Sequence, residues 1–148
     1  MNKELTNAYL AGIIDADGYV GLIKRSVGKR TDLQQNFFVP CVKLASTTPI
    51  ITEFLKKEFG GHMDKPRFTN LPNTKPAVMW SVRNRKLIVE ILHRIEPYMM
   101  IKKERANVVL AFIEECGNWR QTDIPEERRI WYYNKMKNLN HRGLATTE

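Results

Sequence analysis

Helical and strand periodicities alternate along most of this chain. Residues 4–16 are apolar around most of the helical circumference, which predicts a helix buried on more than one side. Residues 19–26 and 33–44 then alternate between apolar and polar positions, which predicts two strands. Pro40 predicts that the second strand lies at an edge or contains a bulge. The positions expected to face the core from these strands are Val20, Leu22, Phe38, Val42 and Leu44.

A second series of elements follows. A helix is predicted over residues 49–59, opened by a proline and closed by two glycines. Strands are predicted at 62–68 and 77–83, on either side of a turn rich in proline and asparagine, and a helix at 85–95. Two more helices are predicted, at 102–116 and 126–138.

The resulting order is α-β-β-α-β-β-α, followed by C-terminal helices. This order favours an α+β domain in which an antiparallel four-stranded sheet carries its helices on one face. We assign residues 1–116 to this core and residues 117–148 to a basic C-terminal helix and tail. The other face of the sheet is expected to be open to a partner.

Length and composition fit one intracellular globular domain. The chain has 148 residues, of which 43% are apolar and 27% charged. Its two cysteines are too few for a disulfide framework and form no C-x-x-C pair, which favours a reducing compartment without a zinc site. The apolar runs are far shorter than the roughly 18 residues that span a bilayer, and the N-terminus has no secretory pattern. We therefore expect no membrane partner.

The net charge indicates an anionic partner. Lys and Arg number 24 against 16 Asp and Glu, which gives a formal charge of +8 and a pI near 9.6. Nucleic acid is the leading candidate for such a chain. Five of the seven polar residues expected on the open face of the sheet are basic, which suits the phosphates along a DNA groove. The alternative is a solvated face that happens to be basic. The seven residues are Tyr19, Arg25, Gln35, Lys43, Lys65, Arg67 and Arg83.

Two carboxylates end the otherwise apolar first helix. They are Asp15 and Asp17, in the stretch Leu-Ala-Gly-Ile-Ile-Asp-Ala-Asp-Gly from Leu10 to Gly18. Half-buried carboxylates need a compensating partner, and the C-terminus of a helix disfavours negative charge. A hard divalent cation would compensate, because Mg²⁺ takes carboxylate and carbonyl oxygens. The alternative is that both aspartates only terminate the helix and accept hydrogen bonds from turn amides.

These nine residues resemble the signature of the LAGLIDADG homing endonucleases, with Ile13 as the one departure. The element order is also that of this family's core, and the resemblance covers roughly residues 4–115. It implies that Asp17 binds a divalent metal, Mg²⁺ or Mn²⁺, with the Ala16 backbone carbonyl, and that Asp15 has a structural role. It also implies that the motif helices of two domains pack through small residues, here Ala8, Ala11 and Gly12.

The resemblance extends to the segment from Pro97 to Lys102, a Pro-aromatic-x-x-x-Lys pattern. Lys102 then matches the family's lysine near the scissile phosphate. The alternative is an ordinary exposed lysine in the first turn of a helix. The family often has a polar residue, commonly Gln, at the end of the second strand to position water. Here Lys43 or Ser46 could serve, and Ser46 joins Asp17 and Lys102 as a candidate catalytic residue.

The motif occurs once, so one chain supplies one Asp17 where a paired site is expected. We therefore expect a homodimer with two-fold symmetry and a near-palindromic target in double-stranded DNA. The resemblance implies a metal-dependent, staggered double-strand break in intron homing. The alternatives on the same fold are an RNA maturase acting on its own intron RNA and a non-catalytic DNA-binding regulator. The candidates for reading bases are Arg25, Gln35 and Arg67, and those for holding phosphates are Lys43 and Lys65.

The C-terminal block combines basic and aromatic residues. A helix of this kind can lie along a DNA backbone, and Arg142 is a candidate DNA contact. The alternative is a helix that packs Ile130, Trp131 and Met136 on the core and shows its charges to water. The basic residues of the block are Arg128, Arg129, Lys135, Lys137, His141 and Arg142, around the aromatic residues Trp131, Tyr132 and Tyr133.

Overall fold

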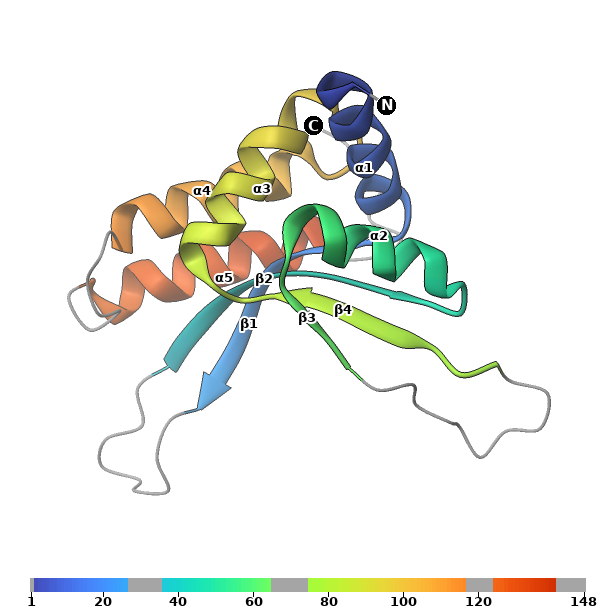
Figure 1. The fold of residues 1–148 in the computed structure, drawn as a ribbon. Coiled ribbons are helices and arrows are strands. Elements are labelled where there is room, and N and C mark those ends of the chain that lie inside the picture. The colour runs from blue at the N-terminus through green and yellow to red at the C-terminus, as the bar shows by residue number, and fades with distance from the viewer. Residues whose placement is uncertain (1, 27–35, 65–74, 117–123, 141–148) are drawn as a thin grey trace.

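The computed structural model describes residues 2–26, 36–64, 75–116 and 124–140. The predicted element order is confirmed (Figure 1). The elements are α1 (Lys3–Asp17), β1 (Tyr19–Ser26), β2 (Asn36–Ser46), α2 (Pro49–Phe59), β3 (His62–Met63), β4 (Val78–Val82), α3 (Arg85–Ile95), the short 3-10 helix η2 (Glu96–Tyr98), α4 (Lys103–Cys116) and α5 (Glu126–Asn140). None of the described helices has the length and apolar character needed to cross a membrane.

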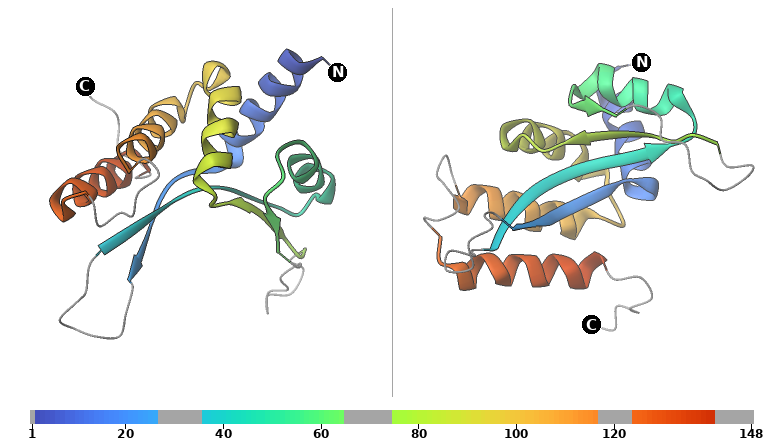
Figure 2. Two further views of the ribbon diagram at one scale, coloured as in Figure 1. Left: turned by 60° about the vertical axis from the view of Figure 1, so that its left-hand side comes forward. Right: turned by 90° about the horizontal axis from the view of Figure 1, so that it is seen from below.

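The four strands form one antiparallel sheet in the order β1-β2-β4-β3. Helices α1, α2 and α3 gather on one side of this curved sheet (Figure 1). Seen from the opposite side, no described helix crosses the strands (Figure 2, right). The predicted α+β architecture, with helices on one face and an open second face, is therefore confirmed.

The core lies between the sheet and its helices. The apolar positions predicted to face it from β1 and β2 are all buried, as are Trp80 and Val82 of β4. The Trp80 indole N–H donates to the Gly60 carbonyl oxygen at 2.8 Å, which satisfies its one polar atom inside the core. Gly61 has a φ of 89°, and a Cβ there would lie 2.7 Å from a Val82 methyl, so the turn between α2 and β3 requires glycine at this position.

The second strand differs from its prediction. β2 extends to Ser46 and lies between β1 and β4, so it is an interior strand, and its register with β1 runs through Pro40 without a bulge. The physical reason is local. Pairing with β4 begins only at Val42, so at Pro40 the strand has a ladder partner on one side alone. Proline is tolerated where its missing N–H costs no ladder bond. Of the strand predicted at 62–68, His62 and Met63 form β3, and Asp64 follows it. Residues 65–68 lie outside the described part of the chain.

The last helix packs on the body of the domain. α5 contacts α4, β1 and β2, and it lies beside the β1 end of the sheet (Figure 2, right). Tyr132 and Met136 are buried, and Tyr133 stacks on Phe38 with ring centroids 4.7 Å apart. Trp131 was expected to pack on the core in one of the two alternatives, but 45% of it is exposed. The buried stripe instead follows the helical spacing of residues 129, 132, 133 and 136.

Candidate active site and nucleic-acid interface

Asp15 joins the end of α1 to the start of α4. Its carboxylate accepts the backbone N–H groups of Met100 at 2.9 Å, Ile101 at 3.0 Å and Lys102 at 2.7 Å. These groups precede and open α4, where backbone N–H groups have no partner inside the helix. Burial raises the pKa of the Asp15 carboxyl, but these three hydrogen bonds outweigh it and hold the pKa below its ordinary value. Asp15 therefore has the structural role that the sequence resemblance implied.

Lys102 is not an ordinary exposed lysine. Only 7% of it is exposed, and its ammonium donates to the backbone carbonyl oxygen of Asp15. Burial and the neighbouring Arg105 lower the pKa of the Lys102 ammonium, while Asp15 and Asp17 act in the opposite direction. The structure thus brings Lys102 and the last residues of the α1 motif together, as expected.

Asp17 is the last residue of α1 and is exposed. Its carboxylate accepts no hydrogen bond from the described residues, which leaves both oxygens open. The next residue allows a tight turn into β1. The Gly18 N–H donates to the Ile14 carbonyl oxygen at 2.9 Å, and a Cβ on Gly18 would lie 2.8 Å from that same oxygen. Any larger residue would therefore push the strand away from the end of the helix.

The oxygen atoms at this turn suit a hard cation. The Asp17 carboxylate and the Ala16 carbonyl, one of the last carbonyls of a helix, are both donors of the kind that Mg²⁺ prefers. The described residues contain no group of three or more His, Cys, Asp or Glu that could hold a metal ion. One chain therefore offers a fitting donor set that is incomplete by itself.

The two candidates for positioning water lie elsewhere on the sheet. Ser46 ends β2, and its Oγ accepts the Thr48 N–H at 3.0 Å in the turn before α2. The Lys43 ammonium lies over the Tyr19 ring, 5.0 Å from its centroid. Within the described residues, no hydrogen bond or ion pair joins either candidate to Asp17 or Lys102. The catalytic role of Ser46 stays a prediction.

The small residues of α1 do not all face the same way. Gly12 is exposed, and a Cβ at this position would meet no atom within 4 Å, whereas Ala8 is half-buried. Ala11 is completely buried inside the chain and has no surface to offer a second copy, which corrects its assignment to a dimer interface. The reason is helical geometry, because Ala11 points to the same side of α1 as the buried residues Leu10 and Ile14.

Two exposed apolar side chains lie on the same face of α1 as Gly12. Leu5 and Tyr9 are 58% and 53% exposed, two turns and one turn before it on the same helix face. Of the seven large apolar side chains left exposed by the described residues, four lie in α1 or in the segment bound by Asp15, and a fifth, Tyr98, comes just before that segment. We call this the α1 face, and its members are Leu5, Tyr9, Gly12, Tyr98, Met100 and Ile101. These exposed side chains make the α1 face a candidate interaction surface.

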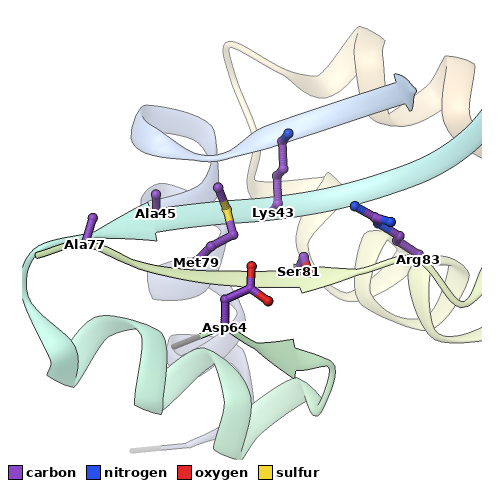
Figure 3. A pocket seen from close by; sticks show the side chains of 7 residues that line it. All are labelled: Lys43, Ala45, Asp64, Ala77, Met79, Ser81 and Arg83. Atoms are coloured by element: carbon purple, nitrogen blue, oxygen red, sulfur yellow. The ribbon is translucent and has the colours of Figure 1, made fainter. Parts of the chain in front are cut away.

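The open face of the sheet is lined by polar side chains from all four strands. The register places Tyr19 opposite Lys43, Lys43 opposite Ser81, and Ser81 opposite His62. Arg25 lies further along β1, and Arg83 follows β4 (Figure 3). The predicted residues of this face that are described therefore lie on it together. The other candidate DNA contacts, Gln35, Lys65, Arg67 and Arg142, lie outside the described residues.

Sequence reasoning missed two members of this face. His62 and Asp64 alternate with Met63, which pairs with the core residue Trp80, so they point toward the open side. The His62 Nε2 lies 2.9 Å from the Asp64 Oδ1. The predicted alternation put Lys65 and Arg67 on this face, and stepping back from them by two residues reaches Met63 and Gly61. It therefore assigned His62 and Asp64 to the opposite side of the strand and gave no signal for them.

Comparison with known proteins bears on the fold. No protein-family model matches the chain, and no curated protein matches it in sequence. The homing endonuclease I-CvuI in complex with its target is 21% identical with a TM-score of 0.76, over 97% of this chain and 87% of that one. The archaeal intron-encoded homing endonuclease I-Vdi141I, complexed with DNA, is 16% identical with a TM-score of 0.75, over 99% and 91%. The LAGLIDADG homing endonuclease I-SmaMI, bound to cleaved DNA, is 17% identical with a TM-score of 0.67, over 99% of this chain and 46% of that one.

At these identities the likeness concerns the fold. It agrees with what the structure shows by itself, a first helix that carries the motif of Leu10 to Gly18 and runs directly into the first strand of an open antiparallel sheet. The chain therefore has the fold of the LAGLIDADG homing endonucleases.

Proposed function

We propose that this protein is a site-specific DNA endonuclease that works as a homodimer, needs a divalent metal and makes a staggered double-strand break. The observation that carries the proposal is the end of α1. There an exposed Asp17 stands beside a buried Lys102, next to an exposed apolar face and at the entry to an open sheet. The structural neighbours are homing endonucleases solved with DNA, which supports this reading.

The residue types suit phosphodiester hydrolysis. A divalent cation, when bound, supplies an activated water and neutralises charge on the phosphate. The Asp17 carboxylate and the Ala16 carbonyl would hold this ion, Mg²⁺ or Mn²⁺. The Lys102 ammonium would stand beside the phosphate as a fixed positive charge where negative charge grows. Its burial and its hydrogen bond to the Asp15 carbonyl restrict its movement, so little reorganisation is needed during the reaction.

The homodimer follows from what one chain lacks. A single Asp17 gives one carboxylate, and a second copy docked on the α1 face would bring another beside it. Gly12 has open space around it, which permits close approach of two helices. The match that covers nearly all of this chain but 46% of I-SmaMI is what a longer chain holding two such units would give. Two-fold symmetry of the protein would favour a near-palindromic target.

The open sheet would bind the target DNA inside the cell. Arg25, Lys43 and Arg83 are the described cations of this face, and a two-stranded ribbon fits the major groove. In this proposal the target is the exon junction at which the intron that encodes the protein inserts. Intron homing would then follow from repair of the break.

The first test is cleavage and gel-shift on the duplex that joins the two exons flanking the intron of this reading frame. We expect a break in Mg²⁺, and a shift without a break in Ca²⁺. Asp17→Asn should still bind this duplex but lose cleavage by about 100-fold or more, the scale on which one electrostatic group acts in catalysis. Glu90→Gln, at an exposed carboxylate of α3, is the matched control and should cleave normally.

Other outcomes favour other functions. Continued cleavage by the Asp17→Asn protein would contradict the assignment of this residue. A shift with no break under any metal would favour a DNA-binding regulator. Binding to the intron RNA without binding to the duplex would favour a maturase.

A further inference from the structure

The open face of the sheet holds a single carboxylate among its described residues, and this exception has a defined environment. Asp64 follows β3, and its backbone N–H donates to the Met79 carbonyl oxygen at 2.9 Å, which extends the pairing of β3 with β4 by one residue. The His62 imidazole meets the Asp64 Oδ1 at 2.9 Å. One carboxylate oxygen is thereby held, while the other has no hydrogen-bond donor among the described residues.

Asp64 shares a pocket with Lys43, Ser81 and Arg83 (Figure 3). These side chains come from β2, from β4 and from the residues that follow β3 and β4, so the sheet itself fixes their relative positions. Within the described part of the chain, neither Lys43 nor Arg83 forms an ion pair with Asp64. Opposite charges thus face one pocket without neutralising each other.

A carboxylate on this surface has a specific meaning if the surface binds DNA. It repels phosphates, so it makes no favourable contact with the DNA backbone. The base-edge group that a carboxylate recognises in the major groove is the N4 amino group of cytosine. A guanidinium recognises N7 and O6 of guanine. In one guanine–cytosine pair these groups lie side by side across the groove.

Resting on the endonuclease function proposed above, we propose that this pocket reads one guanine–cytosine pair in each half of the target. Asp64 accepts the cytosine N4–H, and Arg83 donates to guanine N7 and O6. His62 is a positioning residue, because its contact with Oδ1 orients the carboxylate without touching the base.

The first experiment measures base preference. A library of target duplexes, each position partly randomised, is bound in Ca²⁺ and the bound fraction is sequenced. The unmodified protein should enrich a guanine–cytosine pair at one symmetric pair of positions. Asp64→Ala should lose about 10-fold of that preference and keep the others. Glu90→Ala removes an equal charge from the exposed surface of α3 and should change no position.

The second experiment changes single hydrogen-bonding groups on the DNA bases. N4-methylcytosine at the selected pair places a methyl group where the major-groove N4–H stood and leaves the guanine intact. It should weaken binding by the unmodified protein about 10-fold and leave Asp64→Ala unaffected. With 7-deazaguanine at the same pair, binding should weaken for the unmodified protein and for Asp64→Ala, but not for Arg83→Ala.

The outcomes separate the two proposals. If the unmodified protein enriches a target but Asp64→Ala selects the same bases, this inference is wrong and the endonuclease proposal stands. Equal weakening of the unmodified protein and Asp64→Ala by N4-methylcytosine would show a steric effect and also overturn it. If the unmodified protein enriches no position at all, the site-specific endonuclease proposal fails and this inference fails with it.

Discussion

At the residue scale, the two aspartates of the motif have opposite environments although one residue separates them. Successive α-helical residues are rotated by about 100°, so Asp15 and Asp17 point to different sides of α1. Asp15 is 7% exposed and accepts three backbone N–H groups, whereas Asp17 is exposed at the helix end. The same residue type therefore stabilises the fold at one position and is open to a ligand at the other.

The stability that Asp15 confers depends on pH. Because the folded-state pKa of this carboxyl lies below its ordinary value of 3.8, its contribution is fully present above that value and is lost as the pH falls through the folded-state pKa. Asp15→Asn should lower the free energy of unfolding at pH 7 by about 1–3 kcal/mol, since an amide cannot accept all three N–H groups. Urea unfolding of both proteins from pH 7 to pH 2 measures this difference, which should shrink below pH 3.8.

The control for this prediction is Glu90→Gln. Its carboxylate is exposed on α3, so the change should stay within about 0.5 kcal/mol at every pH. A difference between Asp15→Asn and the unmodified protein that is constant across the whole pH range would show that the loss has a steric origin and that the charge of Asp15 is not the cause.

At the element scale, α5 has a polar overall composition, and a stripe of buried side chains along one face docks it on the domain. Met136 is 1% exposed and Tyr132 is 5% exposed, and both belong to the same buried cluster as the sheet residues Val42 and Phe38. Arg128 remains on the surface, where it pairs with Glu115 at 3.0 Å. The helix thus contributes apolar side chains to the core of the domain, and Arg129 is the charged residue that it buries with them.

Met136→Ala should therefore destabilise the whole domain. Truncating a buried Met leaves a cavity, and the expected loss is about 2–5 kcal/mol. Lys137→Ala, the exposed neighbour, should change stability by less than about 0.5 kcal/mol. Denaturant unfolding followed by tryptophan fluorescence measures both. If Met136→Ala unfolds at the same denaturant concentration as the unmodified protein, α5 is not docked in solution.

The sequence predicted the helices and strands better than it predicted how they pair and pack. Period-two alternation assigned the buried faces of β1 and β2, because one side of each strand meets the helices. It could not show that β2 lies inside the sheet, since strand order depends on pairings between distant residues and Pro40 is tolerated where one side is unpaired. It also could not orient Ala11, because small apolar residues are equally suited to a core and to an interface.

The candidate site was predicted unevenly for a similar reason. Asp17 and Lys102 were predicted as site residues because the motif resemblance links two distant segments, and the structure does bring these segments together, while their catalytic roles stay predictions. Asp64 was missed because a single carboxylate in a short strand has no motif. Its position opposite Met79, in a pocket with Arg83, exists only once β3 is paired with β4.

At the scale of the whole molecule, the open face of the sheet and the α1 face are separate candidate surfaces for the two partners of the proposed function. The open sheet carries Arg25, Lys43 and Arg83, and the α1 face carries most of the large exposed apolar side chains. The α1 face borders Asp17, so dimerisation and metal binding would meet at one place. A monomer would then hold half of the metal site and read half of the target.

Gly12→Leu separates the monomer fold from the proposed dimer. A leucine Cβ would meet nothing within 4 Å in one chain, and leucine favours a helix over glycine by roughly 0.5–1 kcal/mol, so the monomer should fold with equal or higher stability. In the dimer the larger side chain would hold the two α1 helices apart. Sedimentation velocity should show the unmodified protein as a dimer and Gly12→Leu as a folded monomer without cleavage activity. Ala111→Leu, an equally small-to-large change on the exposed side of α4, should remain dimeric and active. A Gly12→Leu protein that sediments as a dimer and cleaves the target would place the interface on another surface.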